Sequence, residues 1–276
     1  MFREEFSNVI SAGRGKIDLL NNSKGRYLVY AMLAGLYVSF GIMLAFTIGG
    51  ILDSANSPST KIIMGASFGV ALSLVVFAGS ELFTGNNFVM TIGILNKEVT
   101  FKECGKVWGL AYAGNFLGSI IAALGFIGAG LTTGSVSDFM IKTAEIKISL
   151  PPEQLFIRGI FCNILVCLAV WCTFRLKTET SKLIMIFWCL FAFVTSGFEH
   201  SIANMSLLVI GVILTKGATI TVAGSLYNLF FVTLGNILGG VLLGVTYHYI
   251  SNKKVENKKL VHIKVYPKVY PLSRTV

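Results

Sequence analysis

Six stretches of mostly apolar residues, separated by short polar segments, make up most of the chain. They cover about 27–52, 62–95, 107–131, 155–174, 183–214 and 221–250. A helix needs about 20 apolar residues to cross a bilayer, so each stretch is long enough for one crossing. The pattern predicts an all-α membrane protein with six transmembrane helices.

The second and fifth stretches are each interrupted by glycines and polar residues. Residues 79–87 and 197–204 share the pattern G-x-E-x-x-x-x-N, in which a glycine precedes a glutamate and an asparagine. Irregular backbone at membrane depth is tolerated only where protein buries it or where it lines a water-filled cavity. We therefore expect the second and fifth helices to be broken near the bilayer centre.

A second signature also occurs once in each half of the chain. Residues 114–118 read G-N-F-L-G and residues 235–239 read G-N-I-L-G. Three crossings per half is an odd number, so the second half must be inverted relative to the first. The sequence thus predicts a 3+3 inverted repeat over about 27–131 and 155–250, with a binding site where the broken helices meet at the midplane.

Composition and charge agree with this class. The chain is 54% hydrophobic and 13% charged, which excludes an ordinary soluble domain. The net charge of +10 does not indicate nucleic acid, because Lys and Arg lie between the apolar stretches. Eighteen of the 23 fall on the side of the N-terminus, and the other side has Lys61, Lys142, Lys147, Arg158 and Lys216. Positive residues mark the cytoplasmic face, so we expect a multi-pass protein of the inner (plasma) membrane with both termini cytoplasmic.

Two segments flank the predicted channel domain of residues 27–250. Residues 1–26 place apolar side chains at helical spacing among basic ones. This predicts an amphipathic cytoplasmic helix, which either lies on the membrane among lipid headgroups or packs against the bundle. Residues 251–276 form a basic cytoplasmic tail, for which the sequence indicates no role.

Three ionisable residues, Glu81, Glu199 and His200, fall deep within apolar stretches. Only one histidine is present at this depth, so neither an enzyme nor a metal or cofactor site is expected. Each glutamate follows its glycine by two residues, where it would accept hydrogen bonds from the N–H groups freed by the break. His200 has Leu82 as its counterpart in the first half, and it can donate a hydrogen bond or carry a proton.

Thr84, Asn163 and Asn236 are polar residues in apolar surroundings. Buried amides in membrane-spanning helices usually hydrogen-bond to neighbouring helices. In a pore they would instead replace part of the hydration of a solute. The sequence leaves both roles open.

Three motifs, in the right order, resemble those of the formate/nitrite transporter family. They are GSELFTG at 79–85, GIFCNILVCLA at 159–169 and GFEHSIANM at 197–205. The resemblance covers residues 1–250 and implies an aquaporin-like helical arrangement, with a homopentamer in which each protomer has its own pore. The loop at about 214–221 looks shorter than in formate channels of the family, which argues against formate as the preferred substrate. Within the family the chain looks most similar to hydrosulfide channels.

The resemblance also implies roles for single residues. Leu72, Leu82 and Phe83 would form a cytoplasmic constriction, and Phe68 with Phe193 an outer one. Thr84, Asn163, His200 and Asn236 would supply polar contacts along or between these narrow points. Lys147 matches the lysine that the family places near the outer vestibule, where it would attract anions.

The predicted function is a membrane channel for small monovalent weak-acid anions, hydrosulfide first, with formate and nitrite also possible substrates. The alternative is a proton-coupled secondary transporter of the same anions, in which the two repeats rock around a fixed site. A water or glycerol channel would carry N-P-A at both half-helix tips, and the chain has no such triplet.

Overall fold

The computed structural model describes residues 2–251, which form helices joined by turns. The helices are α1 (Arg3–Asn22), α2 (Lys24–Ser54), α3 (Thr60–Ser67), α4 (Val70–Leu74), the π-helix η1 (Val75–Gly79), α5 (Phe83–Leu95), α6 (Phe101–Gly128), α7 (Gly134–Ser149), α8 (Pro152–Arg175), α9 (Glu179–Ser196), α10 (Ser201–Leu214) and α11 (Val222–Ser251). The predicted basic tail, apart from its first residue, lies outside the described residues.

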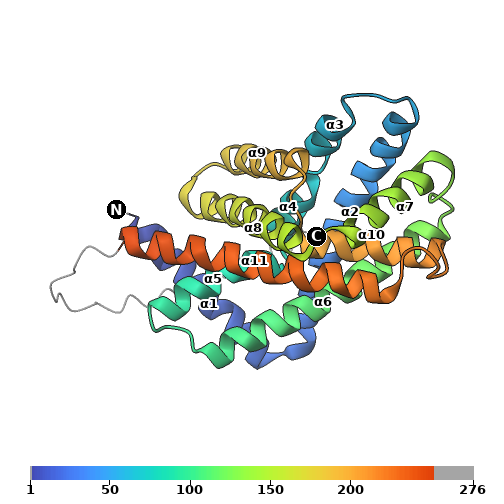
Figure 1. The fold of residues 1–276 in the computed structure, drawn as a ribbon. Helices are drawn as coiled ribbons and strands as arrows, with labels where there is room; N and C mark the ends of the chain where they lie inside the picture. Colours follow the sequence, from blue (N-terminus) through green and yellow to red (C-terminus); the bar gives the residue numbers. More distant parts are fainter. Residues whose placement is uncertain (1, 252–276) are drawn as a thin grey trace, which may run out of the picture.

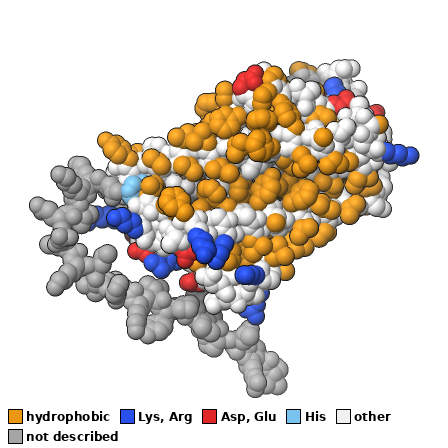
Figure 2. Space-filling view, turned by 60° about the horizontal axis from the view of Figure 1, so that its bottom comes forward, with side chains coloured by type: hydrophobic (Ala, Val, Ile, Leu, Met, Phe, Trp, Pro, Cys, Tyr) orange, Lys and Arg blue, Asp and Glu red, His pale blue; other side chains and the backbone are white. Residues whose placement is uncertain are grey.

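The described residues contain six segments that are long and apolar enough to cross a membrane. They are Lys24–Ser54, Thr60–Gly79, Phe101–Gly128, Pro152–Arg175, Glu179–Ser196 and Val222–Ser251. The half-length helices α5 and α10 complete the second and fifth of these crossings (Figure 1). Hydrophobic side chains cover the middle of the face shown in Figure 2, with charged side chains toward its ends. The predicted all-α fold with six crossings is confirmed.

Both predicted breaks are present, but they are shorter than the polar motifs. Residues 80–82 separate η1 from α5, and residues 197–200 separate α9 from α10. Gly79 and Gly197 have φ angles of 79° and 77°, a left-handed conformation that glycine adopts without steric cost. The asparagines of both motifs lie in the half-helices that follow, since each helix restarts directly after its break.

Close packing of two helix pairs explains the second shared signature. Helix α2 packs against α6, and α8 packs against α11. A Cβ atom on Gly118 would lie 2.0 Å from the Met32 carbonyl oxygen, and one on Gly235 would lie 2.2 Å from that of Phe156. Only glycine allows backbones to approach so closely, so these signatures are helix contacts at equivalent places in the two halves.

The N-terminal segment is a helix packed on the bundle, the second of the two arrangements expected for it. Helix α1 packs mainly against α5 and α2. One face is buried there, consisting of Phe6, Val9, Gly13, Ile17 and Leu20. At its start, the Phe2 and Phe6 rings pack edge-on against Trp171 of α8.

The polar connection at 132–154, between the third and fourth predicted crossings, contains helix α7. Its buried residues Met140 and Ala144 are four apart, so they share one helix face, which packs against α2 and α10. Helices α1 and α7 lie toward opposite ends of the bundle (Figure 1). We call these ends the α1 face and the α7 face.

Candidate functional site

Two vestibules approach the centre of the protomer from opposite faces. Each has a volume of about 380 Å³. Between them lies a central chamber of about 10 Å³, near the minimum volume for one water molecule. The chamber is lined by Val38, Phe68, Ala71, Leu72, Leu82, Val166, Leu190, Phe193 and His200.

Four of the five predicted constriction residues lie where the chamber meets a vestibule. Leu72 and Leu82 line both the chamber and the α1-face vestibule. Phe68 and Phe193 line both the chamber and the α7-face vestibule, and their rings pack edge-on with centroids 5.6 Å apart. A hydrated ion passing from one vestibule to the other would meet apolar side chains at both ends of the chamber.

Phe83, the fifth predicted constriction residue, lies elsewhere. Its ring packs edge-on against Trp108 and Tyr112 of α6, at centroid distances of 6.3 and 5.0 Å. Among the described residues it is not part of the lining of either vestibule or of the chamber. Phe83 is the first residue of α5, and the preceding Leu82 is the one directed at the chamber.

Of the described residues that line the chamber, His200 is the one with a polar side chain, and both its ring nitrogens have partners. The backbone N–H of Ala203 donates to Nδ1 at 3.1 Å, so Nδ1 is an acceptor. A neutral imidazole with this contact carries its proton on Nε2, which lies 2.9 Å from Thr84 Oγ1 and donates to it. Thr84 and His200, which were each expected to supply polar contacts, are therefore in direct contact with each other, although Thr84 itself is fully buried.

The two glutamates each bind a lysine, not the backbone N–H groups that we expected them to accept from. Both carboxylate oxygens of Glu81 lie 2.8 Å from Lys16 Nζ of α1. Both oxygens of Glu199 lie 2.7 Å from Lys147 Nζ of α7. Both lysines occupy the buried side of their helices, because Lys16 follows the buried Gly13 by three residues and Lys147 follows Ala144 likewise.

Asparagines bind the N–H groups freed by the two breaks. Asn115 Oδ1 accepts from the Phe83 N–H and Asn236 Oδ1 accepts from the Ser201 N–H, each at 2.9 Å. Their amide nitrogens donate to the carbonyl oxygens of Glu81 and Glu199. Each asparagine therefore hydrogen-bonds to the backbone on both sides of a break. In the sequence, the shared G-N-x-L-G signature was the feature that could have indicated this role.

Asn163 also makes its hydrogen bonds within the helix bundle. Its amide nitrogen donates to the carbonyl oxygens of Asn236 at 2.6 Å and Thr84 at 3.2 Å. Within residues 2–251, neither Asn163 nor Asn236 belongs to the lining of the three cavities. Of the two roles left open by the sequence, the geometry favours hydrogen bonding between helices for both.

Comparison with known proteins assigns this architecture to a family. The model of the formate/nitrite transporter family matches residues 3–250. The chain belongs to the formate/nitrite transporter family. It is 40% identical over 250 residues to the nitrite transporter NirC of Salmonella typhimurium, covering 89% of this chain and 91% of that protein.

Two solved structures of the family have the same fold. One, described as an FNT family ion channel, is 35% identical with a TM-score of 0.86 and covers 91% of this chain and all of its own. The other, a pentameric formate channel with formate bound, is 27% identical with a TM-score of 0.71 and covers 82% of this chain and 96% of its own. These relatives are named for nitrite, formate or the family, so the predicted hydrosulfide subgroup stays a prediction.

Proposed function

We propose that this protein is a passive channel for small monovalent weak-acid anions, a class that includes nitrite, formate and hydrosulfide. One observation supports it above all: two wide vestibules converge on an apolar chamber with a single imidazole in its wall. The nitrite transporter and the formate channel among its relatives support the same class of solute.

The mechanism follows from the cost of dehydrating an anion. A bare charge is expensive in an apolar chamber, so Leu72, Leu82 and Phe193 exclude ions by narrowness and dewetting. A weak acid avoids that cost if it takes up a proton or accepts a strong hydrogen bond at the constriction. His200 is the group placed to assist, and its Nε2–H would exchange Thr84 for the anion as hydrogen-bond partner.

We further propose that the protein is a homopentamer in the plasma membrane, with the α1 face and both termini cytoplasmic and a separate passage in each protomer. The distribution of 18 and five basic residues supports this orientation. The pentameric assembly of the related formate channel supports the oligomeric state. The exposed apolar side chains of the bundle would then face lipid or a neighbouring protomer.

Uptake into proteoliposomes tests the proposal. Purified protein should admit nitrite, formate and hydrosulfide, with uptake rising as the pH falls toward the pKa of each acid. Competition among the three would decide the preferred substrate; the NirC relative supports nitrite, whereas the resemblance of the motifs favours hydrosulfide. Uptake no faster than in empty vesicles for all three anions would refute the proposed function.

Substitutions of His200 test whether its imidazole takes part in transport. His200→Asn and His200→Ala should lower uptake and change its pH dependence, because they remove the imidazole from the chamber. Wild-type rates in both variants at every pH would exclude the imidazole from the mechanism.

The proton-coupled transporter remains the second candidate, since a small chamber between two vestibules at the midplane also fits the fixed binding site of a rocking transporter. Conductance in planar bilayers separates the two. A channel gives discrete single-protomer currents, whereas a transporter gives saturating flux with a fixed proton stoichiometry.

A further inference from the structure

The two vestibules differ in the charge of the side chains that line them. The α1-face vestibule has one cation and one carboxylate, Lys16 and Glu81, which bind each other. The α7-face vestibule has four cations and two carboxylates: Asp53, Lys61, Lys142, Lys147, Arg158 and Glu199. Its lining therefore has a net charge of about +2, whereas that of the α1-face vestibule is neutral.

Ion pairs neutralise two of the four cations in the α7-face vestibule. Lys147 is bound by both oxygens of Glu199 at 2.7 Å. Lys142 lies 3.0 Å from Asp53. The net positive charge of this vestibule thus does not come from Lys147, the lysine that the family resemblance places near the outer vestibule.

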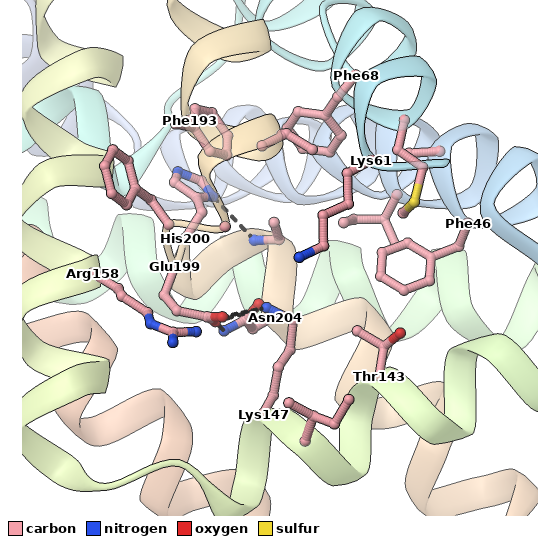
Figure 3. A pocket seen from close by; sticks show the side chains of 18 of the residues that line it. Phe46, Lys61, Phe68, Thr143, Lys147, Arg158, Phe193, Glu199, His200 and Asn204 are labelled. Carbon is pink, nitrogen blue, oxygen red and sulfur yellow. Dashed lines mark hydrogen bonds and ion pairs between the residues drawn. The ribbon is translucent and has the colours of Figure 1, made fainter. Parts of the chain in front are cut away.

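The remaining two cations have no such partner. Within the described part of the chain, no carboxylate oxygen lies within 4.0 Å of the Lys61 or Arg158 side-chain nitrogens. The polar neighbour of Arg158 is the neutral Gln154, whose Oε1 lies 3.4 Å from Nη2. Figure 3 shows Lys61 extending into the pocket from α3 and Arg158 from α8, on different sides of it.

We propose that Lys61 and Arg158 form the anion-capture site of the α7-face vestibule, which holds a small monovalent anion before it reaches Phe193 and His200. This inference rests on the proposed function and adds the residues that concentrate the substrate at one mouth. Lys147 holds the helix break in place through Glu199 and takes no part in capture. The captured anion exchanges with solvent, because its partners lie on an open vestibule wall.

The size of the effect follows from Coulomb's law. An anion about 8 Å from one of these cations, in the high dielectric of a water-filled vestibule, is concentrated about two- to threefold by each of them. At an ionic strength of about 0.01 M the Debye length is about 30 Å, and at about 1 M it is about 3 Å. The capture effect should therefore be full at low salt and absent at high salt.

Nitrite uptake into proteoliposomes at these two ionic strengths, set with potassium gluconate, tests the inference. Lys61→Gln and Arg158→Gln should each slow initial uptake about two- to threefold at low salt, and the double variant about four- to ninefold. All three should match the wild type at high salt. Lys216→Gln is the matched control, since Lys216 lies in the α10–α11 turn on the same face but does not line the vestibule.

Each outcome distinguishes the inference from the proposed function. Uptake by the wild type equal to that of empty vesicles defeats the proposed function. A functional wild type, with a double variant equally fast at low salt, overturns the capture site alone. A double variant that is slowed equally at both ionic strengths also overturns it, because a screened charge effect cannot persist at high salt.

Discussion

Removing the ammonium group of Lys147 should destabilise the protomer far more than removing that of Lys142. The Glu199 side chain is 4% exposed and that of Lys147 16%, with both oxygens in contact. Lys147→Met would leave the buried carboxylate with Asn204 as its donor, at 2.6 Å. Breaking a buried ion pair costs about 3–5 kcal/mol, and the partial exposure of Lys147 favours the lower end.

Two control variants give reference values for this loss of stability. Lys142→Met removes an ion pair whose side chains are 61% and 38% exposed, and should cost less than about 1 kcal/mol. Lys147→Met combined with Glu199→Gln removes both charges and should regain most of the lost stability, because a neutral amide is far less costly to bury than an unpaired carboxylate.

Thermal unfolding of the detergent-solubilised protein, followed by tryptophan fluorescence, measures all three variants in parallel. The single Lys147 variant should melt well below the other two. The reasoning is refuted if Lys147→Met melts no lower than Lys142→Met, or if adding Glu199→Gln lowers the melting temperature further.

Three further substitutions, one of them with a matched control, test a helix contact, a helix break and the constriction. Gly118→Ala should lower the melting temperature and the yield of folded protein, because its Cβ would lie 2.0 Å from a backbone oxygen of α2, whereas Gly125→Ala meets nothing within 4 Å and should behave as wild type. Asn236→Ala should lower the free energy of unfolding by about 1–3 kcal/mol, measured by denaturant titration, because it leaves a buried N–H without its acceptor. Phe193→Ala should admit larger monocarboxylates, measured as uptake of propionate relative to formate, because it removes a ring between the chamber and the α7-face vestibule.

The G-x-E-x-x-x-x-N motif shows how much of the site could be predicted from sequence. Its glycine adopts the left-handed conformation of the break. Its asparagine lies in the first turns of the new half-helix and donates back to the glutamate, Asn86 to Glu81 at 3.0 Å and Asn204 to Glu199 at 2.6 Å. The fixed spacing thus encodes a local structure, which is why the repeat revealed both breaks.

The partners of the glutamates were harder to predict because they come from distant segments. Lys16 and Lys147 lie 65 and 52 residues away from Glu81 and Glu199 along the chain. In both cases, the feature of the sequence that could have indicated the ion pair was a lysine on the apolar side of a helix. The helical character of 134–149 was itself missed, because that segment is more polar than the six crossings.

The position of Phe83 was hard to predict for a different reason. Successive residues of a helix differ by about 100° in direction, so a side chain at the edge of a break is placed only when the end of the break is known to one residue. The motif located the first break within residues 79–87, whereas α5 begins at Phe83. Leu82 consequently lines the chamber and Phe83 packs against α6.

The two halves are alike in their scaffold and differ at the chamber. The lysine–glutamate pair and the asparagine that binds the first N–H of the half-helix occur in both. The equivalent positions Leu82 and His200 both line the chamber, yet only the histidine has polar atoms there. His200 Nδ1 accepts from the Ala203 N–H and so caps α10, whereas α5 begins after Leu82 without a side-chain cap. The first break therefore shows that a half-helix can start without an imidazole, and this cap is a contribution of His200 that is separate from its proposed role toward the solute.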